Sequence, residues 1–480
     1  MSIKKELLSG TFYTAISKYS GMLVSLIIAG ILARMLSPED FGTVAIATVI
    51  ISFFSTFSEF GIGPAIIQNK ELDKKDIQSI FSFTIWIGII ISLLFWSISW
   101  GIGNYYKNQI LITICQLLSI NLFFATINIV PNAIIYRNKE FKYIATRTFF
   151  IQIITGSIAI LAVFLGAGIY ALVISPILSA LLIFLLNFRK YPLPIRLYFK
   201  IDPIKKISNY SFYQFLFNLL NYFGKNIDKL IIGKYMGMNP LGYYEKSYRL
   251  MMLPLQNVAH VLGPVMHPIF SEMQAEKKTM LLSYEKIIHF LAYISFPLST
   301  FLFFTAREIT LIIFGDQWYP SIPIFQILSI CVGIQILLNT SGAIFQAGND
   351  TRSLFICGVF TAATFISAVY IGVIIFKSLK AIAILINIAT LLNFVQCYIT
   401  MYKITFKTNM ISFWKQLLSP CIVTCLTAGI LYITSLLVNQ FNIYLSITIK
   451  LVIFIIIFAI YTQLSKEFNL IKYLKRKTLN

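Results

Sequence analysis

The sequence contains two similar segments, ILARMLSPEDFG at residues 31–42 and IIGKYMGMNPLG at residues 231–242, called the repeated phrase below. Aligned in this way, Gly42 falls on Gly242, and the pair Phe12 and Tyr13 falls on Phe212 and Tyr213. Only a few identities support the match in a chain this rich in Ile and Phe, so the rest of the sequence has to test it. If the repeat is real, it predicts two related halves offset by about 200 residues.

The composition is that of a membrane protein. Of 480 residues, 58% are hydrophobic and 12% are charged, and the mean hydropathy is +0.80, far outside the range of soluble domains. Apolar runs of about 20 residues, each able to cross the hydrocarbon core as a helix, recur along the whole chain. We therefore expect an all-α polytopic membrane protein with about 14 transmembrane helices and no soluble domain between them.

The expected spans share the length and apolar character of a membrane helix. They are residues 10–33, 41–66, 79–102, 109–136, 148–165, 168–188, 208–233, 241–268, 284–306, 319–346, 353–376, 381–402, 411–437 and 443–464.

The charge balance sets the expected orientation. Lys and Arg number 39 against 18 Asp and Glu, which gives a net charge of +21. In membrane proteins such an excess gathers in cytoplasmic segments, and here most basic residues fall in those segments if both termini are cytoplasmic. Lys18 interrupts the first apolar run, so we expect the first helix to be retained rather than cleaved. Nothing in this pattern indicates nucleic-acid binding.

The six cysteines lie inside expected spans and suggest neither a disulfide framework nor a zinc site. No glycine-rich phosphate loop is present, so ATP hydrolysis is not the expected power source.

The repeat predicts the domain organisation. Its offset links the first span to the seventh, so each copy holds about six helices, and an even number of crossings makes the two copies parallel. A second similarity relates residues 132–142 to residues 342–352. We expect an N-lobe at residues 1–200, a C-lobe at 201–405, and a C-terminal helix pair with a basic tail at 406–480.

Polar residues follow one face of four expected helices, because they recur at spacings of three and four. The stripes contain Ser211, Gln214, Asn218, Asn221, Lys225 and Asp228 in the seventh span; Thr11, Thr14, Lys18, Gly21 and Ser25 in the first; Thr48, Ser52, Ser55 and Glu59 in the second; and Glu245, Arg249, Gln256, His260 and His267 in the eighth.

An ionised side chain in mid-membrane costs about 2.5–3.5 kcal/mol on insertion scales, so such groups face protein or water. If the stripes converge, they line a wet cleft with a basic excess, which suits an anionic cargo such as a phosphate or carboxylate. The alternative is that these charges snorkel to the interfaces or pair to lock the bundle. For Lys246, which lies off the stripe, we expect snorkelling, and for His260 and His267 we favour packing.

Several stretches resemble the signature segments of bacterial polysaccharide flippases of the Wzx type, including the teichuronic acid exporter-like branch. They are LARMLSPEDFGTVAIA, FSEFGIGPAIIQ, NIDKLIIGKYMGMNPLGYYEKSYRLMMLP, VMHPIFSEMQ and IIFGDQWYP. That family belongs to the multidrug, oligosaccharidyl-lipid and polysaccharide exporter superfamily. The resemblance implies two lobes of about six helices in a V shape, followed by a further helix pair.

The resemblance also implies a cargo, an undecaprenyl-diphosphate-linked glycan. The cargo would be delivered from the inner to the outer leaflet of the cytoplasmic membrane. Membrane lipids and other polysaccharide assembly proteins are the further partners that the resemblance implies. The basic residues expected to hold the diphosphate are Lys18, Lys225, Lys229 and Arg249, beside the polar Asn218, Asn221 and Gln256. Glu59, Asp228 and Glu245 are candidates for Na+ or H+ coupling or, equally, fixed partners of neighbouring lysines. No cofactor or resident metal is expected.

Two other functions remain open. A drug or cation antiporter of the same superfamily is one, although an acidic, aromatic-lined cavity would be expected for it. A membrane glycan polymerase or glycosyltransferase is the other, and such enzymes generally need an exposed carboxylate or base. The longest expected outer segment, residues 307–318, offers only Glu308 and Asp316. We therefore expect a transporter rather than an enzyme.

Overall fold

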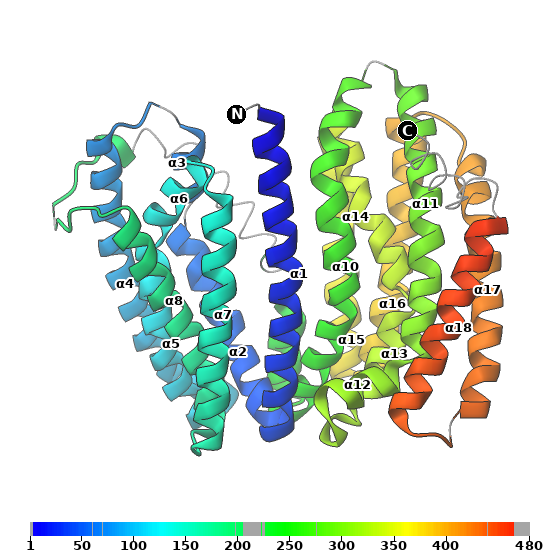
Figure 1. Cartoon of the computed structure of the whole chain (residues 1–480), viewed down its shortest axis with the longest axis horizontal. Helices are drawn as coiled ribbons and strands as arrows, with labels where there is room; N and C mark the ends of the chain where they lie inside the picture. Colours follow the sequence, from blue (N-terminus) through cyan, green and yellow to red (C-terminus); the bar gives the residue numbers. More distant parts are fainter. Residues whose placement is uncertain are drawn as a thin grey trace. The chain divides into compact units, whose positions relative to one another are not determined.

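The computed structural model describes residues 3–59, 61–69, 71–196, 198–204, 222, 226–274, 276–438 and 440–464 (Figure 1). Every regular element within these ranges is a helix, and eleven helices are long and apolar enough to cross a membrane, or up to 12 spans if one bent pair is counted. The expectation of an all-α polytopic membrane protein is confirmed. The number of fourteen spans stays a prediction.

The elements follow one another with short connections. In chain order they are α1 (Ile3–Met35), α2 (Pro38–Glu59), α3 (Ile62–Gln68), α4 (Lys74–Tyr106), α5 (Gln109–Ile127), α6 (Ile129–Arg137), α7 (Phe141–Phe164), η1 (Gly168–Tyr170), α8 (Ala171–Lys190), a helical segment at 226–235, α10 (Met238–Glu272), α11 (Lys277–Phe304), α12 (Ala306–Phe314), η2 (Asp316–Trp318), α13 (Ser321–Ser329), α14 (Val332–Ala347), α15 (Thr351–Ile374), α16 (Leu379–Thr400), η3 (Met401–Thr405), α17 (Ile411–Val438) and α18 (Ile443–Leu464).

The chain forms two compact units, Met1–Gly242 and Tyr243–Asn480, called unit 1 and unit 2 below. The boundary falls inside α10, so a single helix leaves one unit and enters the other. The lobe boundaries predicted at residues 200 and 405 remain predictions.

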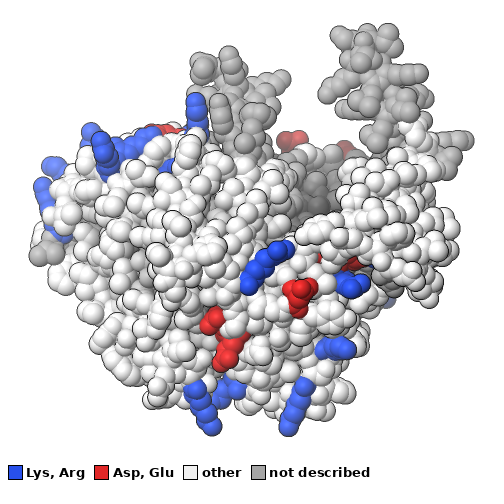
Figure 2. All heavy atoms as spheres, turned by 60° about the horizontal axis from the view of Figure 1, so that its bottom comes forward, with Lys and Arg blue, Asp and Glu red and all other residues white. Residues whose placement is uncertain are grey.

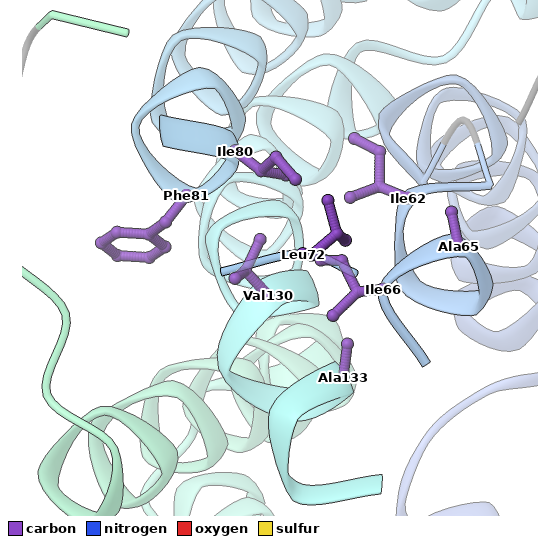
Figure 3. Close-up of a cluster of buried hydrophobic side chains, with 8 residues drawn as sticks. All are labelled: Ile62, Ala65, Ile66, Leu72, Ile80, Phe81, Val130 and Ala133. Carbon is purple, nitrogen blue, oxygen red and sulfur yellow. The ribbon is translucent and has the colours of Figure 1, made fainter. Parts of the chain in front are cut away.

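Unit 1 is a bundle in which α4 packs on α5, α7 packs on α1 and α8, and α3 packs on α6. A buried apolar cluster joins the short helices α3 and α6 to the start of α4 (Figure 3). Its members are fully or nearly fully buried: Ile62, Ala65, Ile66, Leu72, Ile80, Phe81, Val130 and Ala133. The cluster therefore holds α3 and α6 against the start of α4.

The two copies of the repeated phrase touch each other within unit 1. A Cβ atom built on Gly42 would lie 1.8 Å from the carbonyl oxygen of Met238, and one built on Gly242 would lie 1.9 Å from the carbonyl oxygen of Pro38. Each copy therefore presses its glycine against the backbone of the other. Only glycine permits this approach, because any side chain would overlap main-chain atoms that cannot move aside.

Each unit contains an interrupted helix that an asparagine from a later helix stabilises. In unit 1 the chain breaks between α5 and α6 at Asn128, whose Oδ1 accepts a hydrogen bond of 2.8 Å from Asn187. In unit 2, α13 and α14 meet at a bend of 52°, and Asn387 donates to the carbonyl of Ile327 at 2.5 Å. Asn187 and Asn387 stand at the same offset of 200 residues that relates Gly42 to Gly242, which supports an internal repeat.

The last two helices of unit 2 are attached through buried polar contacts. Lys450 of α18 forms an ion pair of 2.5 Å with Glu308 of α12, and both side chains are about 95% buried. Ser446 donates to the same Glu308 oxygen at 2.7 Å, and Lys450 also donates to the Phe304 carbonyl at 2.9 Å. Residues 307–318, the longest expected outer segment, are mostly helical, and Glu308 is engaged by Lys450 and Ser446. That segment folds into α12 and η2 because its apolar residues pack into the unit.

A second polar contact lies farther along α18. The hydroxyl groups of Tyr293, Ser419 and Tyr461, from α11, α17 and α18, form a closed hydrogen-bonded group. Two separate polar contacts thus hold α18 in one rotational setting, which an all-apolar interface between lipid-exposed helices would not specify.

We predict that Gly42→Ala and Gly242→Ala each lower the stability of the folded protein by about 2 kcal/mol or more, because the new methyl group overlaps backbone. Thermal unfolding in detergent micelles measures the loss. Gly101→Ala in α4 is the matched control, since a Cβ there meets nothing within 4 Å. Equal melting temperatures for all three variants would contradict the close crossing.

We predict that Lys450→Met alone costs about 3–5 kcal/mol, because it leaves a buried carboxylate without its charge partner. The double variant Glu308→Gln with Lys450→Met should recover part of this loss. Unfolding by titration with sodium dodecyl sulfate from mixed micelles measures both. Lys380→Met, at an exposed site of α16, serves as the control and should change stability by less than about 0.5 kcal/mol.

Candidate functional site

Four of the predicted site residues lie in the described part of unit 1. Lys18 is exposed on α1, and Glu59 is exposed as the last residue of α2. Asp228 is fully buried in the helical segment 226–235, where its Oδ1 accepts a hydrogen bond of 2.8 Å from the backbone N–H of Lys229. The Lys229 side chain is half-buried. In unit 1, Asp228 is therefore buried, whereas Lys18 and Glu59 are exposed.

Three predicted residues, Asn218, Asn221 and Lys225, lie outside the described residues. The same holds for the side chains of Thr11, Thr14, His260 and His267. Whether the polar stripes converge on one cleft therefore stays a prediction.

Part of the stripe on α1 faces protein. The Gly21 carbonyl accepts a hydrogen bond of 2.8 Å from Gln152 of α7, and a Cβ on Gly21 would lie 3.0 Å from the Gln152 Oε1. The periodicity assigned Gly21 to a polar face but could not say which neighbour covers it. At Gly21 that neighbour is α7, so this position serves helix packing.

Unit 2 carries the charged face of α10. Arg249 and Gln256 are exposed, whereas Glu245 is half-buried. These residues recur on one side of the helix, so their polar groups are presented together along α10. Of the predicted basic residues, Arg249 is the one that unit 2 exposes on α10.

Lys246 does not snorkel as expected. It is only 1% exposed, and its ammonium lies 5.0 Å from the ring centroid of Phe314 and 5.5 Å from that of Trp318. Aromatic faces attract a cation, and the aliphatic stem of the lysine fills apolar space beside them. Lys246 is buried because α12 and η2, which contain Phe314 and Trp318, pack against this part of α10.

Aromatic residues near the predicted site were missed by the sequence reasoning. The Tyr222 hydroxyl donates to the carbonyl of Val49 at 2.5 Å, and its ring lies 5.5 Å from that of Phe53, which in turn lies 4.9 Å from Phe57. Ser52 donates to the Thr48 carbonyl one turn earlier at 2.7 Å. The Ser52 hydroxyl in the α2 stripe is therefore hydrogen-bonded within its own helix. The available signal was the spacing of four between Phe53 and Phe57.

The described residues contain no group of three or more His, Cys, Asp or Glu side chains placed to hold a metal ion. What they offer instead is exposed cationic groups on long helices. Such groups bind anions by charge-assisted hydrogen bonds.

Comparison with known proteins decides the family. Residues 31–323 match the model of the family described as polysaccharide biosynthesis protein. The chain belongs to this family. Teichuronic acid biosynthesis protein TuaB of Bacillus subtilis is 23% identical over 92% of this chain and 91% of its own length. Lipopolysaccharide biosynthesis protein WzxC of Escherichia coli is 24% identical over 78% of this chain and 76% of its own length.

Comparison with solved structures shows the fold of this chain. The lipid II flippase MurJ, in an inward closed conformation, gives a TM-score of 0.74 at 15% identity and covers 94% of this chain and 98% of its own. An inward-facing multidrug transporter of the MATE family gives 0.62 at 15% identity over 84% of this chain and 95% of its own. The resemblance to Wzx-type flippases of this superfamily is confirmed.

We predict that the buried and exposed charges respond differently to substitution. Asp228→Ala should lower stability by about 1–3 kcal/mol, because a buried acceptor of a backbone hydrogen bond is lost. Arg249→Gln and Lys18→Gln should each change it by less than about 0.5 kcal/mol, as is usual at exposed sites. Thermal unfolding measures all three, and an Arg249 variant as unstable as the Asp228 variant would show that Arg249 serves the fold.

Proposed function

We propose that this protein is a flippase that moves undecaprenyl-diphosphate-linked polysaccharide repeat units from the inner to the outer leaflet of the bacterial cytoplasmic membrane. The observation that carries the proposal is the family match over residues 31–323 together with curated relatives named for teichuronic acid and lipopolysaccharide biosynthesis. The fold is shared over 94% of the chain with a protein named as a lipid II flippase, and this supports a lipid-linked cargo.

The proposed mechanism is alternating access. Two lobes of about six helices, arranged in a V and followed by the last helix pair, rock about a central site while the polyprenyl tail stays in lipid. Both termini face the cytoplasm in this proposal. Because moving one charge across the membrane is worth about 2.3 kcal/mol per 100 mV, an interior-negative potential favours outward passage of an anionic diphosphate.

The cationic residues would hold the diphosphate. Lys18 and Arg249 are exposed on α1 and α10, and Lys225 and Lys229 are proposed as their companions on the seventh span. The exposed Gln256 and the residues Asn218 and Asn221 would donate further hydrogen bonds. Arg249 suits the role because a guanidinium binds phosphate oxygens in pairs.

A cation gradient is the proposed supplement to the membrane potential. Glu59, Asp228 and Glu245 are the candidate carboxylates for Na+ or H+. Asp228 is fully buried, and a buried carboxylate that exchanges its partner during a cycle changes in electrostatic energy far more than an exposed one does.

Deletion of the gene in its host tests the function. The lipid-linked repeat unit should accumulate on the inner leaflet, and the wild-type gene should restore export. We predict that Arg249→Gln reduces the export rate by about 10- to 100-fold, the range expected when a charged hydrogen bond is lost. Lys286→Gln, at an exposed site of α11, is the control and should restore export fully.

Two outcomes would contradict the proposal at different levels. Unchanged distribution of the lipid-linked repeat unit after deletion would reject the flippase function. Normal export by Arg249→Gln and Lys18→Gln, with the deletion phenotype intact, would reject only the cationic site. Transport of cationic dyes by the purified protein would favour a drug antiporter instead.

A further inference from the structure

Unit 1 holds a buried arginine that forms no ion pair with any carboxylate in the described part of the chain. Arg147 lies in the second turn of α7 and is 8% exposed. Among the residues that the structure describes, no Asp or Glu forms an ion pair with it. A buried charge without a counter-ion is expensive in the membrane, so such a residue is a functional candidate.

Among the described residues, the Arg147 guanidinium has asparagine partners on one nitrogen and lies 5.8 Å from the centroid of the Tyr143 ring. Its Nη1 donates to Asn187 and, at 3.5 Å, to the Oδ1 of Asn132. Its Nε is buried and has no hydrogen-bond partner in the described part of the chain. A guanidinium presents its donors as a planar fork, and a phosphate accepts hydrogen bonds from two of them at once. A buried donor left without a partner implies a ligand, water or ion that satisfies it.

The acidic residue closest along the chain is engaged elsewhere. Glu140 forms an ion pair with Lys190 and accepts a hydrogen bond from Tyr191. Partial desolvation raises the pKa of the Glu140 carboxyl, but the hydrogen bonds from Lys190 and Tyr191 outweigh it and hold that pKa below its ordinary value. Glu140 therefore stays charged beside Lys190 and leaves Arg147 to another anion.

An apolar stripe runs along α7 from Arg147. Phe150, Ile154, Ile158 and Leu161 follow it at spacings of 3, 4, 4 and 3, which keeps all of them on the same helical face. Their exposed fractions are 60%, 48%, 37% and 60%. In a bilayer this face meets hydrocarbon chains. A lipid with its phosphate at Arg147 would lay its chain along the stripe.

The surroundings attract anionic headgroups. Lys139, Lys142 and Arg189 are exposed at the same end of unit 1, and Figure 2 shows Lys and Arg side chains gathered along one edge of the surface, at the upper left. Basic groups at a membrane surface raise the local concentration of anionic lipids. Arg147 thus lies behind a basic rim and at the head of a lipid-facing stripe.

We propose that Arg147 anchors a binding site for the phosphate group of a membrane lipid, with Nε donating to the phosphate and the lipid chain lying along Phe150, Ile154, Ile158 and Leu161. The site is distinct from the cationic residues proposed to carry the cargo. The proposal specifies only a phosphate and a hydrocarbon chain, so it does not depend on the proposed function.

The wild-type protein provides the first test. Delipidated protein in detergent should be stabilised against heat by polyprenyl phosphate and not by the uncharged polyprenol of the same length. Phosphatidylglycerol and inorganic phosphate are the further arms. Stabilisation by polyprenyl phosphate alone assigns the cargo type of lipid, stabilisation by both lipids assigns a general lipid-phosphate site, and stabilisation by inorganic phosphate at equal concentration assigns free phosphate. Equal stabilisation by polyprenol would overturn the proposal.

Variants provide the second test, with binding read by native mass spectrometry as the lipid retained. Arg147→Gln should weaken phosphate-lipid binding by about 10- to 100-fold, as expected for loss of a charged hydrogen-bond donor. Arg147→Lys, which keeps the charge without the fork, should fall between this variant and wild type. Lys75→Gln, which removes an exposed charge in the first turn of α4, should retain most binding. If Arg147→Gln misfolds, Arg147→Lys decides, and wild-type affinity in the folded Arg147 variants would refute the site.

Discussion

A polar group inside a bilayer must find its partner within the protein, because hydrocarbon offers none. This constraint governs the two interrupted helices. Asn187 bonds the residue at which α5 gives way to α6, and Asn387 bonds the last turn before the bend between α13 and α14. A break in a membrane helix is stable only when another helix supplies such a group. An asparagine recurs at one offset in both units, and it bonds a side chain at the first break and a backbone carbonyl at the second.

The same constraint divides the charged residues into two classes. Glu308 and Lys450 satisfy each other in the interior of unit 2, and Lys246 lies against aromatic rings. These charges specify how helices attach. Lys18 and Arg249 are exposed on their helices and contribute little to packing. Their positive charge lies at the surface of each helix, and the proposed phosphate contacts are placed there for that reason.

Much of the architecture follows from local sequence, and the exceptions have definite causes. Hydropathy alone predicts the helical membrane fold, and the segment around LSPEDFG indicates the family. Periodicity assigns a residue to a helical face but not to a neighbour, so it could not foresee that α7 covers Gly21 or that α12 buries Lys246. The breaks at Asn128 and at Cys331 escaped notice because one irregular residue does not disturb an apolar run.

The contact between Gly42 and Gly242 bears on how the two halves of the gene product diverged. At the crossing, a change in one copy collides with the main chain of the other. The match between the copies at these two glycines is therefore maintained by direct contact, in addition to the offset that they share with Asn187 and Asn387.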